Sequence, residues 1–193
     1  LTSVLDLEIW SYTTVIGDFV VPVSPVISDP ESHALEWVRV DEVADHPLHP
    51  SFEDAWSHLR PALHLRPVVV VDAANVVGSV PDGWWKDRAG ATDRLLDRLE
   101  TLAGTGLEAS ALSMPGDRWF PRFVVVLEGE ARGVADRDGL VELVRAEASG
   151  DDAIVDTVSD LASAGAGRVV VPVQARAWRR VDGAGGGRAG MGG

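Results

Sequence analysis

The spacing pattern of apolar residues along the chain differs before and after about residue 67. Beyond it, short and mostly apolar runs predict the strands of a buried sheet at 68–71, 123–127, 140–144 and 168–173. Apolar residues recur at helical spacing in two further segments, 84–102 and 151–162. Strands that alternate with helices predict an α/β fold in three layers, with a parallel sheet between two layers of helices.

The segment before residue 67 has a less regular pattern. It predicts a strand or hairpin arm, a half-buried strand, a short helical turn and an amphipathic helix, over 10–21, 34–40, 41–44 and 51–59. Asp41 and Ser51 are the expected N-caps of the turn and of the helix. The prolines of 61–67 predict a hinge between this segment and the α/β part.

Composition and charge narrow the class of protein. The chain has 193 residues, of which 46% are hydrophobic, a fraction that is normal for a globular protein. Lys and Arg number 17 against 30 Asp and Glu, and the formal net charge of −13 disfavours loose binding to nucleic-acid phosphates. Cysteine is absent, which excludes disulfides, cysteine-ligated zinc and thiol nucleophiles. Without a signal peptide or a long apolar run, we expect a cytoplasmic protein.

Acidic residues stand where the predicted strands end. Asp72 ends the first buried strand, with Asn75 three residues further on, and Glu128 ends the second strand. Asp151 and Asp152 open the late helix. Because ligands bind at the carboxyl ends of parallel strands, we expect these side chains to converge. Convergent carboxylates suit Mg²⁺, which can activate water and stabilise charge on a phosphoryl group.

These residues receive provisional roles on that basis. Four carboxylates are the candidate metal ligands: Asp72, Glu128, Asp151 and Asp152. Asp72, Asp151 and Asp152 are also the candidate catalytic residues, and Asn75 is a candidate for substrate binding. A purely structural interpretation stands beside each role. The two adjacent aspartates can simply cap a helix, Asp72 can close a turn, and Glu128 can be solvated.

The string PDGWWKDRAG is a further candidate for ligand contact. Trp84 and Trp85 lie beside Lys86 and Arg88, so they can stack on bases or can anchor a loop onto the sheet. Asp87 and Arg88 are candidate substrate-binding residues at the rim of the site. The two histidines of DHPLHP lie in a rigid turn, where hydrogen bonding to the backbone is the commoner role. No phosphate-binding glycine motif is present, which disfavours ATPase and dehydrogenase functions.

Three strings, VVVVDAANVVGS, FVVVLEG and SGDDAIV, occur in this order over about 67–173 and resemble a PIN-like domain of the NYN type. The resemblance implies a three-layer α/β/α fold and a nuclease, mostly acting on RNA, that depends on Mg²⁺ or Mn²⁺. It places the polar positions of the family motifs on Asp72, Asn75, Glu128, Asp151 and Asp152. One departure is that the family's acid after the fourth strand is missing, since 171–176 reads VPVQAR.

Two other strings, WSYTTVIGDF and ESHALEWVRVDEVADHPLHPSFEDAWSHLR, resemble the C-terminal half of a Nudix hydrolase over about 10–60. The catalytic box of that family, whose glutamates hold Mg²⁺ near a pyrophosphate, does not occur in the chain. Nudix hydrolysis by the family's mechanism is therefore not expected. The expected parts are a Nudix-like fragment, a linker, a PIN/NYN-like domain and a disordered glycine-rich tail, over 1–60, 61–66, 67–173 and 174–193.

The two resemblances imply a fragment of a Nudix-family hydrolase joined to a PIN/NYN-like domain, with the tail resembling an out-of-frame translation. The expected chemistry is hydrolysis of RNA phosphodiesters or of nucleotides, with Mg²⁺ or Mn²⁺ as the cofactor. A nucleotide or RNA is the expected partner, and no contact with a membrane is expected. The alternative is a catalytically degenerate module that binds a nucleotide or a protein.

Overall fold

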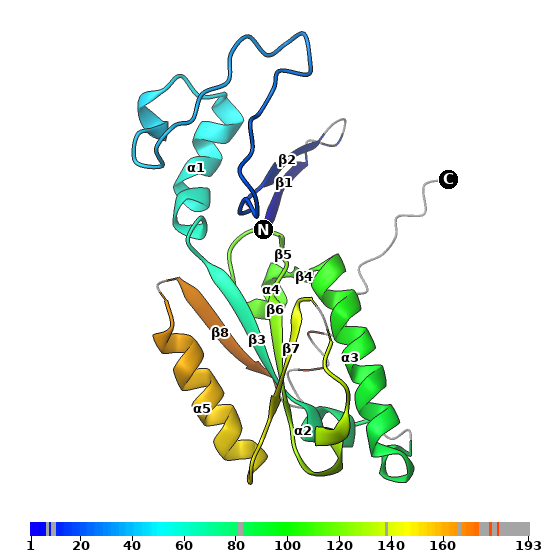
Figure 1. Cartoon of the computed structure of the whole chain (residues 1–193). Coiled ribbons are helices and arrows are strands. Elements are labelled where there is room, and N and C mark those ends of the chain that lie inside the picture. Colours follow the sequence, from blue (N-terminus) through cyan, green and yellow to red (C-terminus); the bar gives the residue numbers. More distant parts are fainter. Residues whose placement is uncertain are drawn as a thin grey trace, which may run out of the picture.

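The computed structural model describes residues 1–6, 8, 11–80, 83–137, 139–165, 167–173, 178 and 181. Over these residues the chain is a mixed α/β protein with one parallel and one antiparallel sheet, each of four strands (Figure 1). The parallel sheet has the order β7-β6-β3-β8, and its strands are β3 (Arg66–Asp72), β6 (Arg122–Leu127), β7 (Val141–Arg145) and β8 (Arg168–Val173). These bounds confirm the four strands predicted after residue 67.

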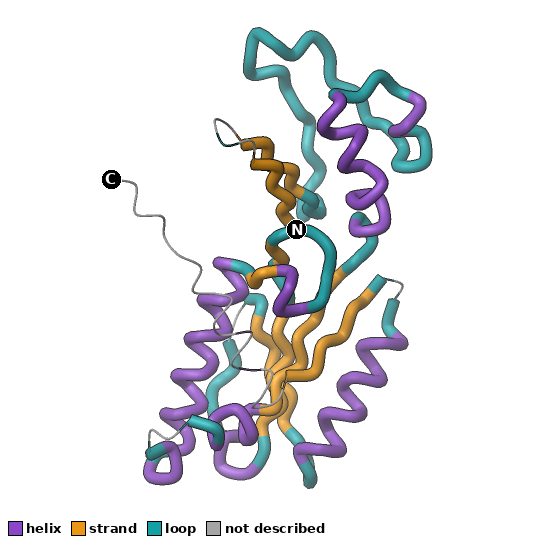
Figure 2. Tube along the Cα trace, turned by 180° about the vertical axis from the view of Figure 1, so that it is seen from behind, coloured by secondary structure: helices purple, strands orange, loops and turns teal. Residues whose placement is uncertain are grey.

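Helices cover both faces of the parallel sheet (Figure 2). Successive residues of a strand point to opposite faces, so a strand buried on both sides must be apolar throughout. In β3, Val68 and Val70 pack toward α5 (Gly150–Ser163), whereas Val69 and Val71 pack toward α3 (Arg88–Thr105). The sheet therefore lies between two hydrophobic clusters, and its strand ends lead directly into helix starts.

The helix predicted over 84–102 begins later than expected. The structure has a short 3-10 turn, η2 (Trp84–Lys86), and then α3, with Asp87 between them as the N-cap that accepts a hydrogen bond from the Gly90 N–H at 2.9 Å. The helix ends at Thr105, and the next residue, Gly106, has a φ of 74°, in the left-handed region. A Cβ there would lie only 2.8 Å from the carbonyl oxygen of Trp119, so the close approach requires glycine.

The N-terminal hairpin belongs to the antiparallel sheet, which has the order β2-β1-β5-β4. Its strands are β1 (Thr2–Asp6), β2 (Ser11–Val15), β4 (Leu107–Glu108) and β5 (Arg118–Trp119). Thr2 pairs with Arg118, and the Val4 N–H donates to the Asp117 carboxylate at 2.7 Å. The strand predicted over 10–21 is thus confirmed only for its first part, and Trp10 lies outside the described residues.

The prediction that Ser51 caps the helix is wrong, and the connection expected over 61–67 is shorter in the structure. The helix α1 (Pro50–Ala62) begins one residue earlier than expected, and His49 is its N-cap, accepting from the Ser51 N–H at 3.3 Å. Proline is well suited to a first helical position, which explains the earlier start. Pro61 lies inside α1 and Pro67 lies inside β3, so helix and strand are nearly continuous.

The strand predicted over 34–40 is also wrong. Within this segment the structure has neither strand nor helix, and Leu35 and Trp37 are 50% and 66% exposed. Among the described residues no strand pairs with this segment, and alternation alone cannot supply the missing backbone hydrogen bonds. The expected helical turn is present as the 3-10 turn η1 (Val43–Asp45), but its N-cap is Glu42, which makes no side-chain capping bond, and not Asp41.

Three short helical elements were not predicted. They are α2 (Ala73–Gly78), α4 (Ala109–Leu112) and η3 (Gly129–Gly133). The tail predicted over 174–193 lies outside the described residues, except for Trp178 and Val181, whose side chains are buried in the core. In the part of the chain that the structure describes, no helix has both the length and the apolarity needed to cross a membrane.

Candidate functional site

Asp72 lies at the junction between β3 and α2. It is the N-cap of α2, and its Oδ1 accepts a hydrogen bond from the Asn75 N–H at 2.9 Å. Burial of the side chain raises the pKa of Asp72, and the negative charges of Glu128 and Asp151 raise it further. The hydrogen bond from Asn75 opposes this shift without cancelling it. Asp72 is therefore a capping residue and, at the same time, part of a concentration of negative charge.

Glu128 directly follows β6 and reaches the start of α5. Its Oε2 accepts a hydrogen bond from the Gly150 N–H at 3.0 Å. The N-cap of α5, Ser149, makes no side-chain capping bond, so a carboxylate from another strand satisfies this backbone donor. A Cβ at Gly150 would overlap the Glu128 carboxylate, and glycine is what permits the contact.

These groups line one pocket, which we call the acidic pocket. It has a volume of about 310 Å³ and is lined by Asp72, Ala74, Asn75, Glu128, Ser149, Gly150 and Asp151. Four residues chosen from the sequence are thus brought together at the carboxyl ends of two adjacent parallel strands. Asp152 lies in the exposed first turn of α5 and does not line this pocket.

A second pocket adjoins the first and has a volume of about 250 Å³. We call it the tryptophan pocket, and it is lined by Ala73, Ala74, Val77, Trp84, Arg88, Thr92, Glu128, Gly129, Glu130 and Ala131. The guanidinium carbon of Arg88 lies 5.5 Å from the centroid of the Trp84 ring. Asp87 caps α3 and lines neither pocket, so the structure brings Arg88 to the site and leaves its neighbour in a structural role.

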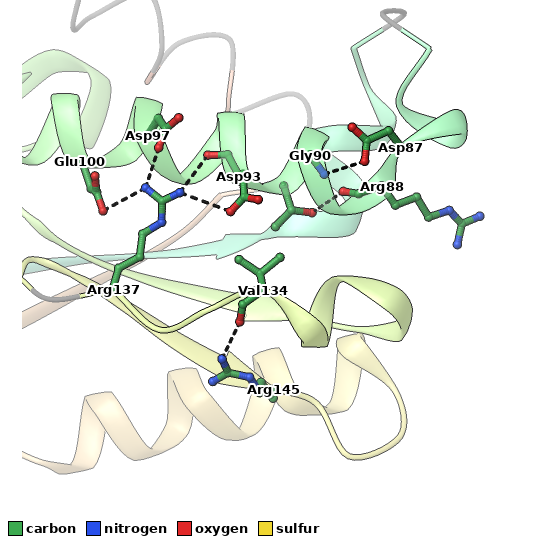
Figure 3. A network of polar contacts seen from close by, with 10 residues as sticks. Asp87, Arg88, Gly90, Asp93, Asp97, Glu100, Val134, Arg137 and Arg145 are labelled. Atoms are coloured by element: carbon green, nitrogen blue, oxygen red, sulfur yellow. Dashed lines mark hydrogen bonds and ion pairs between the residues drawn. The ribbon is translucent and has the colours of Figure 1, made fainter.

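An arginine network holds the chain segment that follows η3 (Figure 3). Arg137 donates to Asp97 at 2.6 Å and lies 3.1 Å from Glu100 and 3.4 Å from Asp93, all three on α3. The hydrogen bond to Asp97 is the largest of several contacts that raise the pKa of Arg137. Arg145 of β7 donates to the Val134 carbonyl at 2.8 Å. Together these contacts tie the segment after η3 to α3 and β7.

The sequence did not point to Glu130, Ser149 or Gly150 as residues of the site. Glu130 is three positions beyond the end of β6, and the η3 turn brings it to the tryptophan pocket. Gly150 had a weak sequence signal, because a glycine directly before an acidic helix start leaves room for a neighbouring side chain. His49, directly before α1, accepts a hydrogen bond from a backbone N–H, and bonding to the backbone is the commoner role of a histidine in a turn such as DHPLHP.

The carboxylates of the acidic pocket are the candidate ligands of a divalent cation. Among the described residues, no group of three or more His, Cys, Asp or Glu side chains is close enough to hold a metal ion directly. Burial is the main cause of the raised pKa of Asp72, and the negative charges of Glu128 and Asp151 make smaller contributions in the same direction. Mg²⁺ keeps several waters and commonly takes only one or two carboxylates, so the donor set fits a hydrated ion.

Comparison with known proteins gives a partial match. The chain is 45% identical over 53 residues to proteins named "Putative 8-oxo-dGTP diphosphatase 3" from two strains of Mycobacterium tuberculosis. The matched region is 28% of this chain and 24% of each relative, so the chain spans about a quarter of the length of the curated relatives that it matches. No family model matches the chain, and no solved structure matches it.

Proposed function

We propose that the chain hydrolyses a phosphodiester or phosphoanhydride bond of RNA or a nucleotide at the acidic pocket, with Mg²⁺ or Mn²⁺. The observation that carries the proposal is the convergence of Asp72, Glu128 and Asp151 on one pocket at the carboxyl ends of β3 and β6. Convergent carboxylates at this edge of a parallel sheet are suited to a hard cation and a phosphoryl group.

Each side chain has a distinct part in this proposal. Asp72 and Asp151 would hold the hydrated cation, which when bound lowers the pKa of water and offsets phosphoryl charge. Glu128, whose carboxylate accepts a hydrogen bond from the Gly150 N–H, would orient the waters around the cation. Asn75 lines the same pocket and would contact the substrate.

The proposal keeps the domain division drawn from the sequence resemblances. Residues 67–173 would form a PIN/NYN-like domain, and the helices on both faces of its parallel sheet support that assignment. Residues 1–60 would be related to a Nudix hydrolase. The matched 53 residues are 45% identical to proteins named "Putative 8-oxo-dGTP diphosphatase 3", and this identity supports a relation to nucleotide hydrolases for that part of the chain.

The test is hydrolysis of a labelled RNA strand and of a nucleoside triphosphate, each with Mg²⁺ or Mn²⁺. The Asp72→Asn variant keeps a good N-cap but loses the charge, so its rate should fall roughly 100-fold or more. Asp156→Asn is the matched control, because Asp156 is an exposed acid of the same helix as Asp151. Equal rates for the wild type and Asp72→Asn on both substrates would refute the proposal.

A binding module without catalysis is the second candidate. The observation in its favour is that the described carboxylates form no direct metal cluster of three. This candidate predicts that nucleotide binds to the wild type while neither RNA nor triphosphate is cleaved with either metal. Metal-dependent cleavage that is lost in Asp72→Asn would exclude it.

A further inference from the structure

The tryptophan pocket has the chemistry of a site for a planar ring. Ala73, Val77 and Ala131 give it apolar lining, and Trp84 adds an aromatic surface. Aromatic side chains are the usual platforms on which nucleobases stack. Its volume of about 250 Å³ is at the small end for a ligand site, which favours one ring system over an extended ligand.

The polar groups of this pocket select among ring systems. Glu128 and Glu130 both line it, and an ionised carboxylate accepts hydrogen bonds but donates none. A base that presents N–H groups is therefore favoured, and a base that presents ring acceptors in their place is repelled. Guanine offers two neighbouring N–H donors, on N1 and N2, which match the two oxygens of one carboxylate. Adenine places an acceptor at N1.

Arg88 supplies positive charge beside the same ring. Its guanidinium carbon lies 5.5 Å from the Trp84 centroid, and its side chain is exposed at the start of α3. A guanidinium can stack on an aromatic plane and can pair with a phosphate in a bidentate manner. In a chain with a formal charge of −13, a cation at this place offsets repulsion between the acidic pocket and an anionic ligand.

We infer that the tryptophan pocket binds the base of a guanine nucleotide whose phosphate lies at the acidic pocket. Ala74 and Glu128 line both pockets, so they are continuous and one nucleotide can occupy them together. This inference rests on the proposed function for the position of the phosphate. It adds the substrate class, a guanine nucleotide, and names Trp84 and Glu130 as residues that determine it.

Calorimetric binding in Mg²⁺ buffer tests the inference, with guanosine 5′-monophosphate and ribose 5-phosphate as probes. The wild type should bind the guanosine monophosphate more tightly. Trp84→Leu should weaken that binding roughly fivefold or more, since stacking contributes on this scale, and should leave ribose 5-phosphate unaffected. Trp85→Leu is the matched control: Trp85 is 61% exposed and does not line the tryptophan pocket, so its affinities should stay within about twofold.

Glu130→Gln provides a second variant, because Glu130 is exposed and its replacement should not affect folding. It should reduce the preference for guanosine over adenosine 5′-monophosphate. Equal binding of guanosine monophosphate and ribose 5-phosphate by the wild type would overturn the inference, as would unchanged binding by Trp84→Leu. If the protein hydrolyses its substrate but binds guanosine monophosphate independently of Trp84, the proposed function is retained and the base pocket is refuted. Binding that depends on Trp84 without hydrolysis would retain the base pocket and refute the proposed function.

Discussion

Replacing Arg137 with methionine removes the charge that three acids of α3 share, while it keeps much of the side chain's apolar contact. The Arg137 side chain is only 19% exposed, but Asp93, Asp97 and Glu100 are 52%, 69% and 42% exposed, so each pair is screened by solvent. Exposed pairs contribute about 0.2–1 kcal/mol each. The variant also leaves like charges at i,i+4 and i,i+3 unrelieved, and the total loss should be roughly 1–2 kcal/mol.

Thermal unfolding measures this loss. For a chain of this size, about 1 kcal/mol lowers Tm by roughly 2–4 °C, so Arg137→Met should unfold about 2–8 °C below the wild type. Arg122→Met is the control, because Arg122 pairs only with Glu142 among the described residues, at 2.7 Å, and both are exposed. In about 1 M NaCl the Arg137 effect should shrink by half or more, as the Debye length falls to about 3 Å. A Tm change that is under about 1 °C, or independent of salt, would refute this reasoning.

Three further variants distinguish effects on folding stability from effects on the candidate site. Gly150→Ala should displace the Glu128 carboxylate with little change in Tm, because the overlap is with the end of a flexible side chain, and should reduce hydrolysis roughly tenfold or more. Asp72→Asn should raise Tm at neutral pH. In the folded protein the pKa of Asp72 is raised above its ordinary value of 3.8, so the buried negative charge destabilises the fold at any pH above the folded-state pKa. Below pH 3.8 the carboxyl is protonated in both states and this cost disappears. A gain in Tm of Asp72→Asn that persists at pH 3 would contradict this. Gly167→Ala, at φ 84° against the His64 carbonyl, should cost about 2 kcal/mol or more in urea unfolding, and an unchanged midpoint would be inconsistent with that geometry.

The parallel sheet was predictable from the sequence because each of its strands carries its own signal. Segments such as 68–71 and 123–127 are apolar on both faces, and a short run of this kind is typical of a strand buried between two layers. The strand predicted over 34–40 failed because pairing depends on a neighbour that no local pattern reveals. The two-residue strands β4 and β5 were missed for the same reason, since their existence depends on long-range contacts.

The candidate site was predictable as far as strand ends determine it. Asp72 and Glu128 follow neighbouring parallel strands, and the structure brings both to one pocket. The choice between Asp151 and Asp152 was not predictable, because successive residues of a helix point about 100° apart and only the docked helix decides which one lines the pocket. The contribution of Glu130 depends on the path of η3, which has no periodic signal.

Manganese binding tests the central claim most directly, namely that the acidic pocket holds a divalent cation. Calorimetry or electron paramagnetic resonance would compare the wild type with Asp72→Asn and Asp156→Asn. The account predicts one Mn²⁺ site in the wild type, an affinity lower by roughly tenfold or more in Asp72→Asn, and no change in Asp156→Asn. The same stoichiometry and affinity in all three proteins, or no Mn²⁺ binding by the wild type, would contradict it.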